Sequence, residues 1–139
     1  MVAMEIAKRE EQINYPYENT FEAGIMAENI YCRPDILNPI CEDKWNIIEV
    51  KSSTSVKDVN IDDVSFQRFC CKKAGLKIGK CFLMYINNQY TKDGDIDPEQ
   101  LFIIEDISDA VEERSAGVEE RVLNLLEVIS NKAYPEVTI

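Results

Sequence analysis

A carboxylate and an ammonium group stand two residues apart at the end of an apolar run, in the stretch IIEVKSSTSVKD over residues 47–58. Side chains alternate between the two faces of a strand, so Glu49 and Lys51 are predicted to share one face. Asp35 lies near the end of an earlier strand candidate, YCRPDIL over residues 31–37. If these two strands pair, the carboxylates of Asp35 and Glu49 converge at one edge of a sheet.

Two neighbouring carboxylates repel each other unless a proton or a cation lies between them. Hard divalent cations such as Mg²⁺ and Mn²⁺ prefer oxygen ligands and retain several waters, so this pair is suited to such an ion. Lys51, on the same face, is then placed to contact the water or the attacked phosphate. The sequence contains no histidine. That absence excludes Ser-His-Asp and Cys-His catalytic groups and most zinc sites, but not this chemistry.

The ordered set of motifs is more specific than three residues alone. Pro34-Asp35 followed by Glu49-Val50-Lys51 resembles the PD-(D/E)XK nuclease superfamily. The wider pattern resembles the RecB-like nuclease domain of a group of bacterial proteins of unknown function, related to the CRISPR-associated RecB-like exonucleases. This pattern comprises TFEAGIMAENIYCRPDIL, IIEVKSSTSVKD, DVSFQRF, AGL and LFIIEDIS, and extends from about residue 20 to the C-terminus.

The resemblance implies a metal site built on four residues. Asp35 and Glu49 would hold Mg²⁺ or Mn²⁺, assisted by the backbone carbonyl of Val50. Glu22, expected on the preceding helix, would complete the metal shell. Lys51 would position or activate the water.

The resemblance also assigns a catalytic role to Gln67, which matches the glutamine of the family's Q-x-x-x-Y motif on the helix that flanks the site. The fifth position of that motif is Cys71 rather than tyrosine, which puts the substrate contacts in doubt. Tyr90 is another aromatic residue, but the sequence does not place it.

The cysteines depart from the pattern of the relatives, which carry clustered iron–sulfur cysteines after the last helix. This chain stops at AYPEVTI, about where such a cluster would begin, and none of its five cysteines has that spacing. We therefore expect no iron–sulfur cluster in this chain. Thiols that behave as small buried apolar side chains are the simpler interpretation. We also expect residues 1–139 to be a single nuclease-like domain of a longer protein.

The function implied by the resemblance is metal-dependent hydrolysis of DNA phosphodiester bonds, of an exonuclease-like kind. Two alternatives stay open: a catalytically inactive nuclease-fold module that binds DNA or a protein partner, and a hydrolase of another phosphoester. Each residue also has a simpler interpretation. Glu49 and Lys51 could be a surface pair worth under about 1 kcal/mol. Asp35 could be a turn residue, and Glu22 and Gln67 could be solvated helix positions.

Charge and hydropathy bear on the partners. The net charge is −11, and only residues 49–81, with seven basic and four acidic side chains, carry a positive excess. An acidic chain is not an obvious DNA binder, because phosphate contacts dominate affinity for DNA.

No apolar run approaches the roughly 18 residues of a membrane span, and no apolar signal core begins the chain. We expect a cytoplasmic protein without a membrane partner, acting on DNA beside the remaining domains of a longer protein.

Periodicity and turn residues predict the elements that must position these groups. Helices are expected at residues 2–12, 18–29, 63–75 and 108–133, and strands at 31–37, 45–53, 80–86 and 101–107. The apolar runs at 80–86 and 101–107 are typical of buried strands. From residue 18 the order is α-β-β-α-β-β-α, which predicts an α/β fold with a mixed central sheet of about four strands and helices on both faces. The resemblance implies a restriction-endonuclease-like core.

Overall fold

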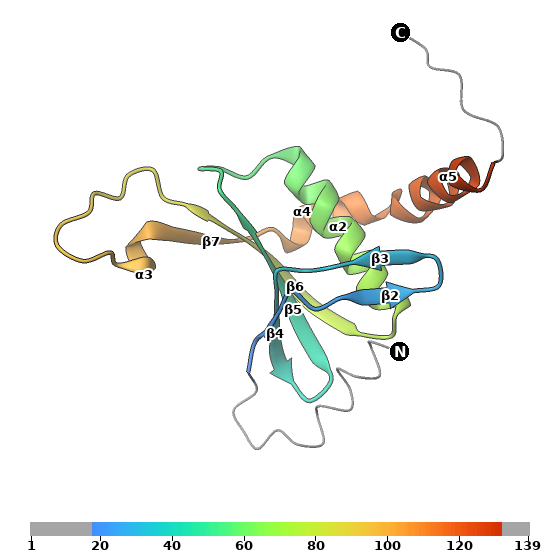
Figure 1. The fold of residues 1–139 in the computed structure, drawn as a ribbon, viewed down its shortest axis with the longest axis horizontal. Helices are drawn as coiled ribbons and strands as arrows, with labels where there is room; N and C mark the ends of the chain where they lie inside the picture. Colours follow the sequence, from blue (N-terminus) through green and yellow to red (C-terminus); the bar gives the residue numbers. More distant parts are fainter. Residues whose placement is uncertain (1–17, 132–139) are drawn as a thin grey trace, which may run out of the picture.

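A five-stranded mixed sheet forms the centre of the protein, described for residues 18–131 by a computed structural model (Figure 1). Its order is β1-β4-β5-β6-β7, in which β5 and β6 are parallel and the other neighbours are antiparallel. The strands are β1 (Thr20–Phe21), β4 (Ile36–Cys41), β5 (Lys44–Lys51), β6 (Lys77–Ile86) and β7 (Phe102–Asp106). The predicted mixed α/β architecture is therefore confirmed.

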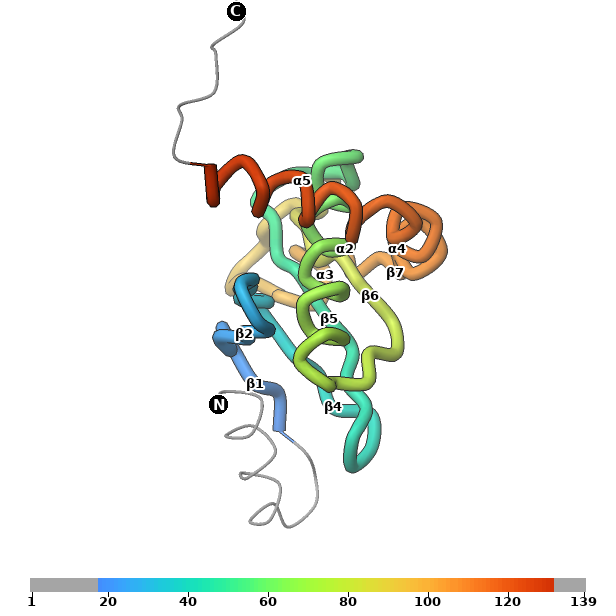
Figure 2. The backbone as a smooth tube through the Cα atoms, turned by 90° about the vertical axis from the view of Figure 1, so that its right-hand side faces the viewer, coloured from blue at the N-terminus to red at the C-terminus, as the bar shows by residue number. Residues whose placement is uncertain are grey.

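The helices of the described segment are α2 (Asp58–Lys73), α3 (Pro98–Leu101), α4 (Ser108–Ser115) and α5 (Val118–Ser130). α2 is the crossover between the parallel strands β5 and β6 and packs against both, and α4 and α5 contact α2 (Figure 2). The covered face of the sheet carries Ile47 and Leu83, both fully buried. Ile48 and Met84, which alternate with them, are only half-buried. Within residues 18–131 the helices thus cover one face, and not both as predicted.

The core lies between this sheet face and α2. Trp45, Ile47, Val64, Leu83 and Val111 belong to one buried cluster. Four of the five cysteines are part of it, as expected for thiols that behave as apolar side chains, whereas Cys41 is exposed. Burial raises the pKa of Cys81 to about 11, so its thiol stays neutral near pH 7.

The helix predicted over residues 18–29 is wrong. This segment forms β1, a bend, and then a hairpin of β2 (Ile25–Ala27) with β3 (Ile30–Cys32). Ile25 and Ala27 are buried while Met26 between them is exposed, which is the period of a strand. Glu28 turns the hairpin with a positive φ of 53°, a conformation that a helix interior excludes. The predicted helix at 2–12 lies outside the described residues.

The strands predicted at residues 31–37 and 45–53 have different bounds in the structure. Residues 31–37 divide between the end of β3 and the start of β4, and Asp35 lies in a bend between them. β4 continues through Pro39 to Cys41, and the chain turns at Glu42-Asp43. Within residues 18–131, β1 pairs with β4 only at Ile36 and Leu37, so Pro39 lies beyond that pairing, where the strand tolerates a missing N–H. β4 and β5 pair in the antiparallel sense, so the strand candidates at 31–37 and 45–53 do lie beside each other in the sheet.

Two predictions for the C-terminal part also need correction. β7 is an edge strand with Ile103 and Ile104 exposed, not a buried strand. The single helix expected over 108–133 is interrupted at Ala116-Gly117 into α4 and α5. Val118 and Val122 of α5 are buried, whereas Leu125 and Ile129, at the same helical spacing, are exposed. None of the described helices has the length and apolar character needed to cross a membrane.

The buried face of β6 should carry much of the stability. Leu83 is fully buried in the middle of the sheet, so Leu83→Ala should lower the free energy of unfolding by about 2–5 kcal/mol. Ile104→Ala, at a position that is 55% exposed on the edge strand, should change it by less than about 0.5 kcal/mol. Urea unfolding of both variants measures the difference. Equal losses would contradict the assignment of the core to the face under α2.

Candidate active site

Glu49 and Lys51 lie on the same face of β5, as the alternation predicts. Lys51 Nζ is 2.6 Å from Glu49 Oε1. The Glu49 side chain is only 7% exposed, whereas that of Lys51 is 29% exposed, so the pair forms at the border between core and solvent. A carboxylate at this depth needs partners, because a buried charge without them is costly.

Two side chains of α2 complete the partners of this pair. Gln67 Nε2 donates to Glu49 Oε2 at 2.9 Å, and Lys51 Nζ donates to Asp63 Oδ2 at 2.8 Å. The structure thus brings Gln67 to the predicted site. Asp63 was not predicted, although its position four residues before Gln67 places both on one side of a helix. The spacing D-x-x-x-Q was therefore the available sequence signal.

Asp35 reaches the same region from the neighbouring strand. β4 and β5 pair Ile36 with Ile48, so one further step of the register sets Asp35 opposite Glu49. Asp35 Oδ2 accepts a hydrogen bond of 2.8 Å from the backbone N–H of Val50. A strand residue directs its N–H and C=O to the same side. The Val50 carbonyl is accordingly directed toward the Asp35 side of β5.

Glu22 is not on a helix. It lies in the bend after β1 with a positive φ of 49°, and its backbone N–H donates to the backbone carbonyl of Asp35 at 2.9 Å. This hydrogen bond brings the Glu22 backbone beside the predicted site. Its side chain is exposed and makes no contact with the other predicted site residues within the segment 18–131. The structure thus places Glu22 near Asp35 but does not join its carboxylate to the cluster.

The position of the family's tyrosine is occupied by a core thiol. Cys71 is fully buried, and its Sγ lies 4.0 Å from Cys32 Sγ. Tyr90 has a different role. Its hydroxyl accepts a hydrogen bond from the backbone N–H of Asp97 and holds the loop before α3. Tyr85 of β6 is the aromatic residue beside Lys51 in the strand register, and its hydroxyl donates to Glu105 Oε2 at 2.6 Å.

The Lys51 ammonium group is held between two carboxylates. Glu49 and Asp63 both accept hydrogen bonds from Lys51 Nζ. Partial burial alone would lower the pKa of Lys51. The hydrogen bonds to Asp63 and Glu49 outweigh burial and raise that pKa above its ordinary value, so Lys51 is an ammonium group at neutral pH.

The donor set fits a hard divalent ion that needs few protein ligands. No three His, Cys, Asp or Glu side chains within residues 18–131 form a ready-made metal centre. Mg²⁺ is nevertheless commonly bound by one or two carboxylates, with water and substrate oxygens completing its shell. Asp35 and Glu49 can supply the carboxylates, because each oxygen keeps a free lone pair beside its present hydrogen bond.

Gln67 leaves one polar atom beside Glu49 without a donor. The residue is 5% exposed, and its buried Oε1 atom has no hydrogen-bond partner within residues 18–131. Exchanging the oxygen and nitrogen of the Gln67 amide would not give Oε1 a donor, because Oε1 would then face the Glu49 carboxylate. A buried acceptor without a donor costs about 1–3 kcal/mol. A water molecule or a ligand donor next to Glu49 would satisfy it.

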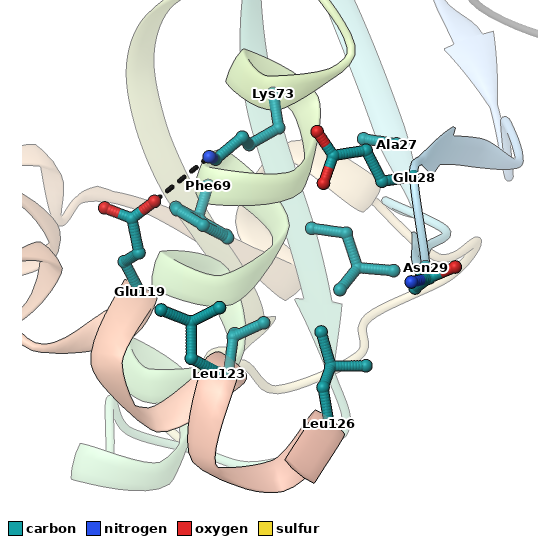
Figure 3. A pocket seen from close by; sticks show the side chains of 10 residues that line it. Ala27, Glu28, Asn29, Phe69, Lys73, Glu119, Leu123 and Leu126 are labelled. Carbon is teal, nitrogen blue, oxygen red and sulfur yellow. Dashed lines mark ion pairs between the residues drawn. The ribbon is translucent and has the colours of Figure 1, made fainter. Parts of the chain in front are cut away.

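A pocket between α2, α5 and the β2–β3 turn shares no residue with this cluster (Figure 3). Phe69, Leu123 and Leu126 supply apolar surface, and Lys73 Nζ pairs with Glu119 Oε1 at 3.0 Å at its rim. Its cation is thereby neutralised. The pocket offers apolar contact but no group with an evident chemical role, so the cluster around Glu49 is the candidate active site.

Comparison of the chain with protein-family models gives no match, and comparison with the curated proteins gives no relative.

Removing the ammonium group should expose the cost of the buried carboxylate. Lys51→Met leaves Glu49 and Asp63 without their cation, so the free energy of unfolding should fall by about 1–3 kcal/mol at pH 7. Lys80→Met is the matched control, since Lys80 pairs with Asp106 at the surface, where solvent screens the pair, and its loss should have a clearly smaller effect. Urea unfolding measures both. An equal and small effect would mean that Glu49 and Lys51 are only a surface pair.

Proposed function

We propose that this protein is a divalent-metal-dependent deoxyribonuclease that hydrolyses phosphodiester bonds, acting in an exonuclease-like manner. The observation that carries the proposal is that the Glu49 carboxylate of β5 is bonded by the Lys51 ammonium group and by the buried Gln67 amide of α2. Asp35, just before β4, accepts from the adjacent Val50 N–H. These are the groups that the resemblance to the PD-(D/E)XK nucleases assigns to catalysis, here Asp35, Glu49, Lys51 and Gln67.

Asp35 and Glu49 would hold the cation, with the Val50 carbonyl as a third protein ligand. When bound, Mg²⁺ or Mn²⁺ supplies a Lewis acid that lowers the pKa of water and neutralises charge on a phosphoryl oxygen. The carboxylates offer the oxygen ligands that these ions prefer. Glu22 is retained in the proposal only through its backbone, which fixes Asp35, because its carboxylate is exposed.

Lys51 would stabilise the negative charge that develops on the phosphate when water attacks phosphorus and the 3′ oxygen leaves. Two of its N–H groups are donated to carboxylates, which holds the ammonium group in place before the substrate arrives. Fixed charges of this kind contribute most where water is excluded, and Lys51 lies at such a border. Gln67 would keep Glu49 oriented through Nε2, leaving Oε1 to accept from water or substrate.

Cleavage of DNA should depend on both charged residues of β5. With Mn²⁺ at low salt, the parent protein should degrade linear single-stranded or double-stranded DNA. Lys51→Ala and Glu49→Ala should each lower the rate at least about a hundredfold, because each removes a group that stabilises the transition state. Lys80→Ala, which removes an exposed lysine on β6, should cleave like the parent.

The pattern of failures separates the alternatives. Equal cleavage by the parent and by Lys51→Ala would show that the activity comes from elsewhere. DNA binding by the parent without any cleavage would favour an inactive module. Cleavage of a small phosphodiester that DNA does not inhibit would favour a hydrolase of another phosphoester.

The metal site can be measured without turnover. Calorimetric titration should show Mn²⁺ binding to the parent, with affinity at least about tenfold lower in Asp35→Asn and in Glu49→Gln. Asp106→Asn removes an exposed carboxylate on β7 and should leave the affinity unchanged. Identical affinities in all four proteins would refute metal binding at Asp35 and Glu49.

A further inference from the structure

We propose that Asp63 is a positioning residue, which holds the Lys51 ammonium group in its working orientation from α2. This inference rests on the proposed nuclease function, because the orientation of Lys51 matters only if Lys51 acts on a substrate. Asp63 does not touch the substrate in this account. It acts through the 2.8 Å hydrogen bond between Lys51 Nζ and Asp63 Oδ2.

The number of donors on an ammonium group is the first argument. Lys51 Nζ carries three N–H groups, of which one is donated to Glu49 and one to Asp63. With two N–H groups anchored, the direction of the third is determined. With only Glu49 as a partner, the ammonium group could rotate about that single hydrogen bond. Asp63 therefore converts a flexible cation into a directed donor.

Glu49 has to serve two cations, whereas Asp63 serves one. In the proposed function Glu49 is also a metal ligand, so its negative charge is shared between the cation and Lys51. Asp63 has no such second demand, and within residues 18–131 its carboxylate contacts only Lys51. It would keep Lys51 in place when Glu49 is engaged by a metal ion.

The rigidity of α2 is the third argument. Asp63 is followed by Val64 and Ser65, both fully buried, which fix this turn of α2 against the core. Lys51 is the last residue of β5 and is followed by bends over residues 52–55. A carboxylate on a packed helix is thus the firmer anchor for a side chain at the end of a strand.

The orientation of Lys51 can be tested directly by NMR. Hydrogen exchange of the Lys51 ammonium protons, in a protein labelled with ¹⁵N on lysine, reports how they are held, and Lys51→Arg assigns the signal. Asp63→Ala should speed this exchange at least several-fold. Asp62→Ala is the matched control, because Asp62 is its neighbour on α2 but pairs with Arg114. Unchanged exchange in Asp63→Ala would overturn the proposal.

The catalytic consequence has its own signature. Asp63→Ala should lower kcat for DNA cleavage by about 10–100-fold, leave KM nearly unchanged, and leave Mn²⁺ affinity as in the parent. Asp63→Glu should restore part of the loss, since it returns an acceptor for the ammonium group. Weaker Mn²⁺ binding in Asp63→Ala would instead make Asp63 a metal ligand and overturn the assignment.

The two tests keep this proposal separate from the proposed function. If the parent does not cleave DNA, the nuclease function fails, while the exchange measurement still decides whether Asp63 orients Lys51. If the parent cleaves and Asp63→Ala cleaves equally well, the positioning role fails and the nuclease function stands. Thermal unfolding of Asp63→Ala must show that the variant is folded at the assay temperature.

Discussion

The buried carboxylate of Glu49 is the constraint on which the rest of the site depends. A charge at this depth must be compensated by a nearby opposite charge. Lys51 can provide it because it lies two residues after Glu49 and therefore on the same face of the strand. The remaining lone pairs require donors from a second layer. α2 supplies one of these through Gln67, and it supplies a second anion for Lys51 through Asp63. The crossover helix is therefore both the cover of the core and one wall of the candidate active site.

The sheet order follows the same logic. β5 lies between β4 and β6, so the Glu49 end of β5 has a neighbour on each side. Asp35 lies just before β4 begins. Its carboxylate accepts a hydrogen bond from the Val50 N–H of β5, in the place of a backbone carbonyl. β6 brings Tyr85 beside Lys51. A site at this point draws on three strands and one helix, although its two central residues are almost adjacent in sequence.

The amount that sequence predicts differs from one element to another. β5 and β6 are apolar runs bounded by turn residues, and α2 ends at Lys73, shortly before Gly75, whose φ of +95° suits a glycine. The existence of all three was predictable, although α2 begins at Asp58 rather than at residue 63. The conformation of residues 18–29 was not predictable, because the spacing of Phe21, Ile25 and Met26 fits one face of a helix as well as it fits a hairpin. There the tertiary context decides, since burial of Ile25 and Ala27 against α2 selects the strand period.

The candidate site divides in the same way. The structure joins Glu49 to Lys51 and Gln67 and sets Asp35 against the adjacent Val50 N–H, while Glu22 was tied to a helix that does not form. The contact of Asp63 with Lys51 can be inferred only from the structure, in which α2 packs against the end of β5. The most direct test of the central claim is anomalous diffraction from crystals soaked in Mn²⁺. The account predicts a manganese peak within coordination distance of the Asp35 and Glu49 carboxylates. Well-ordered carboxylates with no peak between them at saturating Mn²⁺ would contradict it.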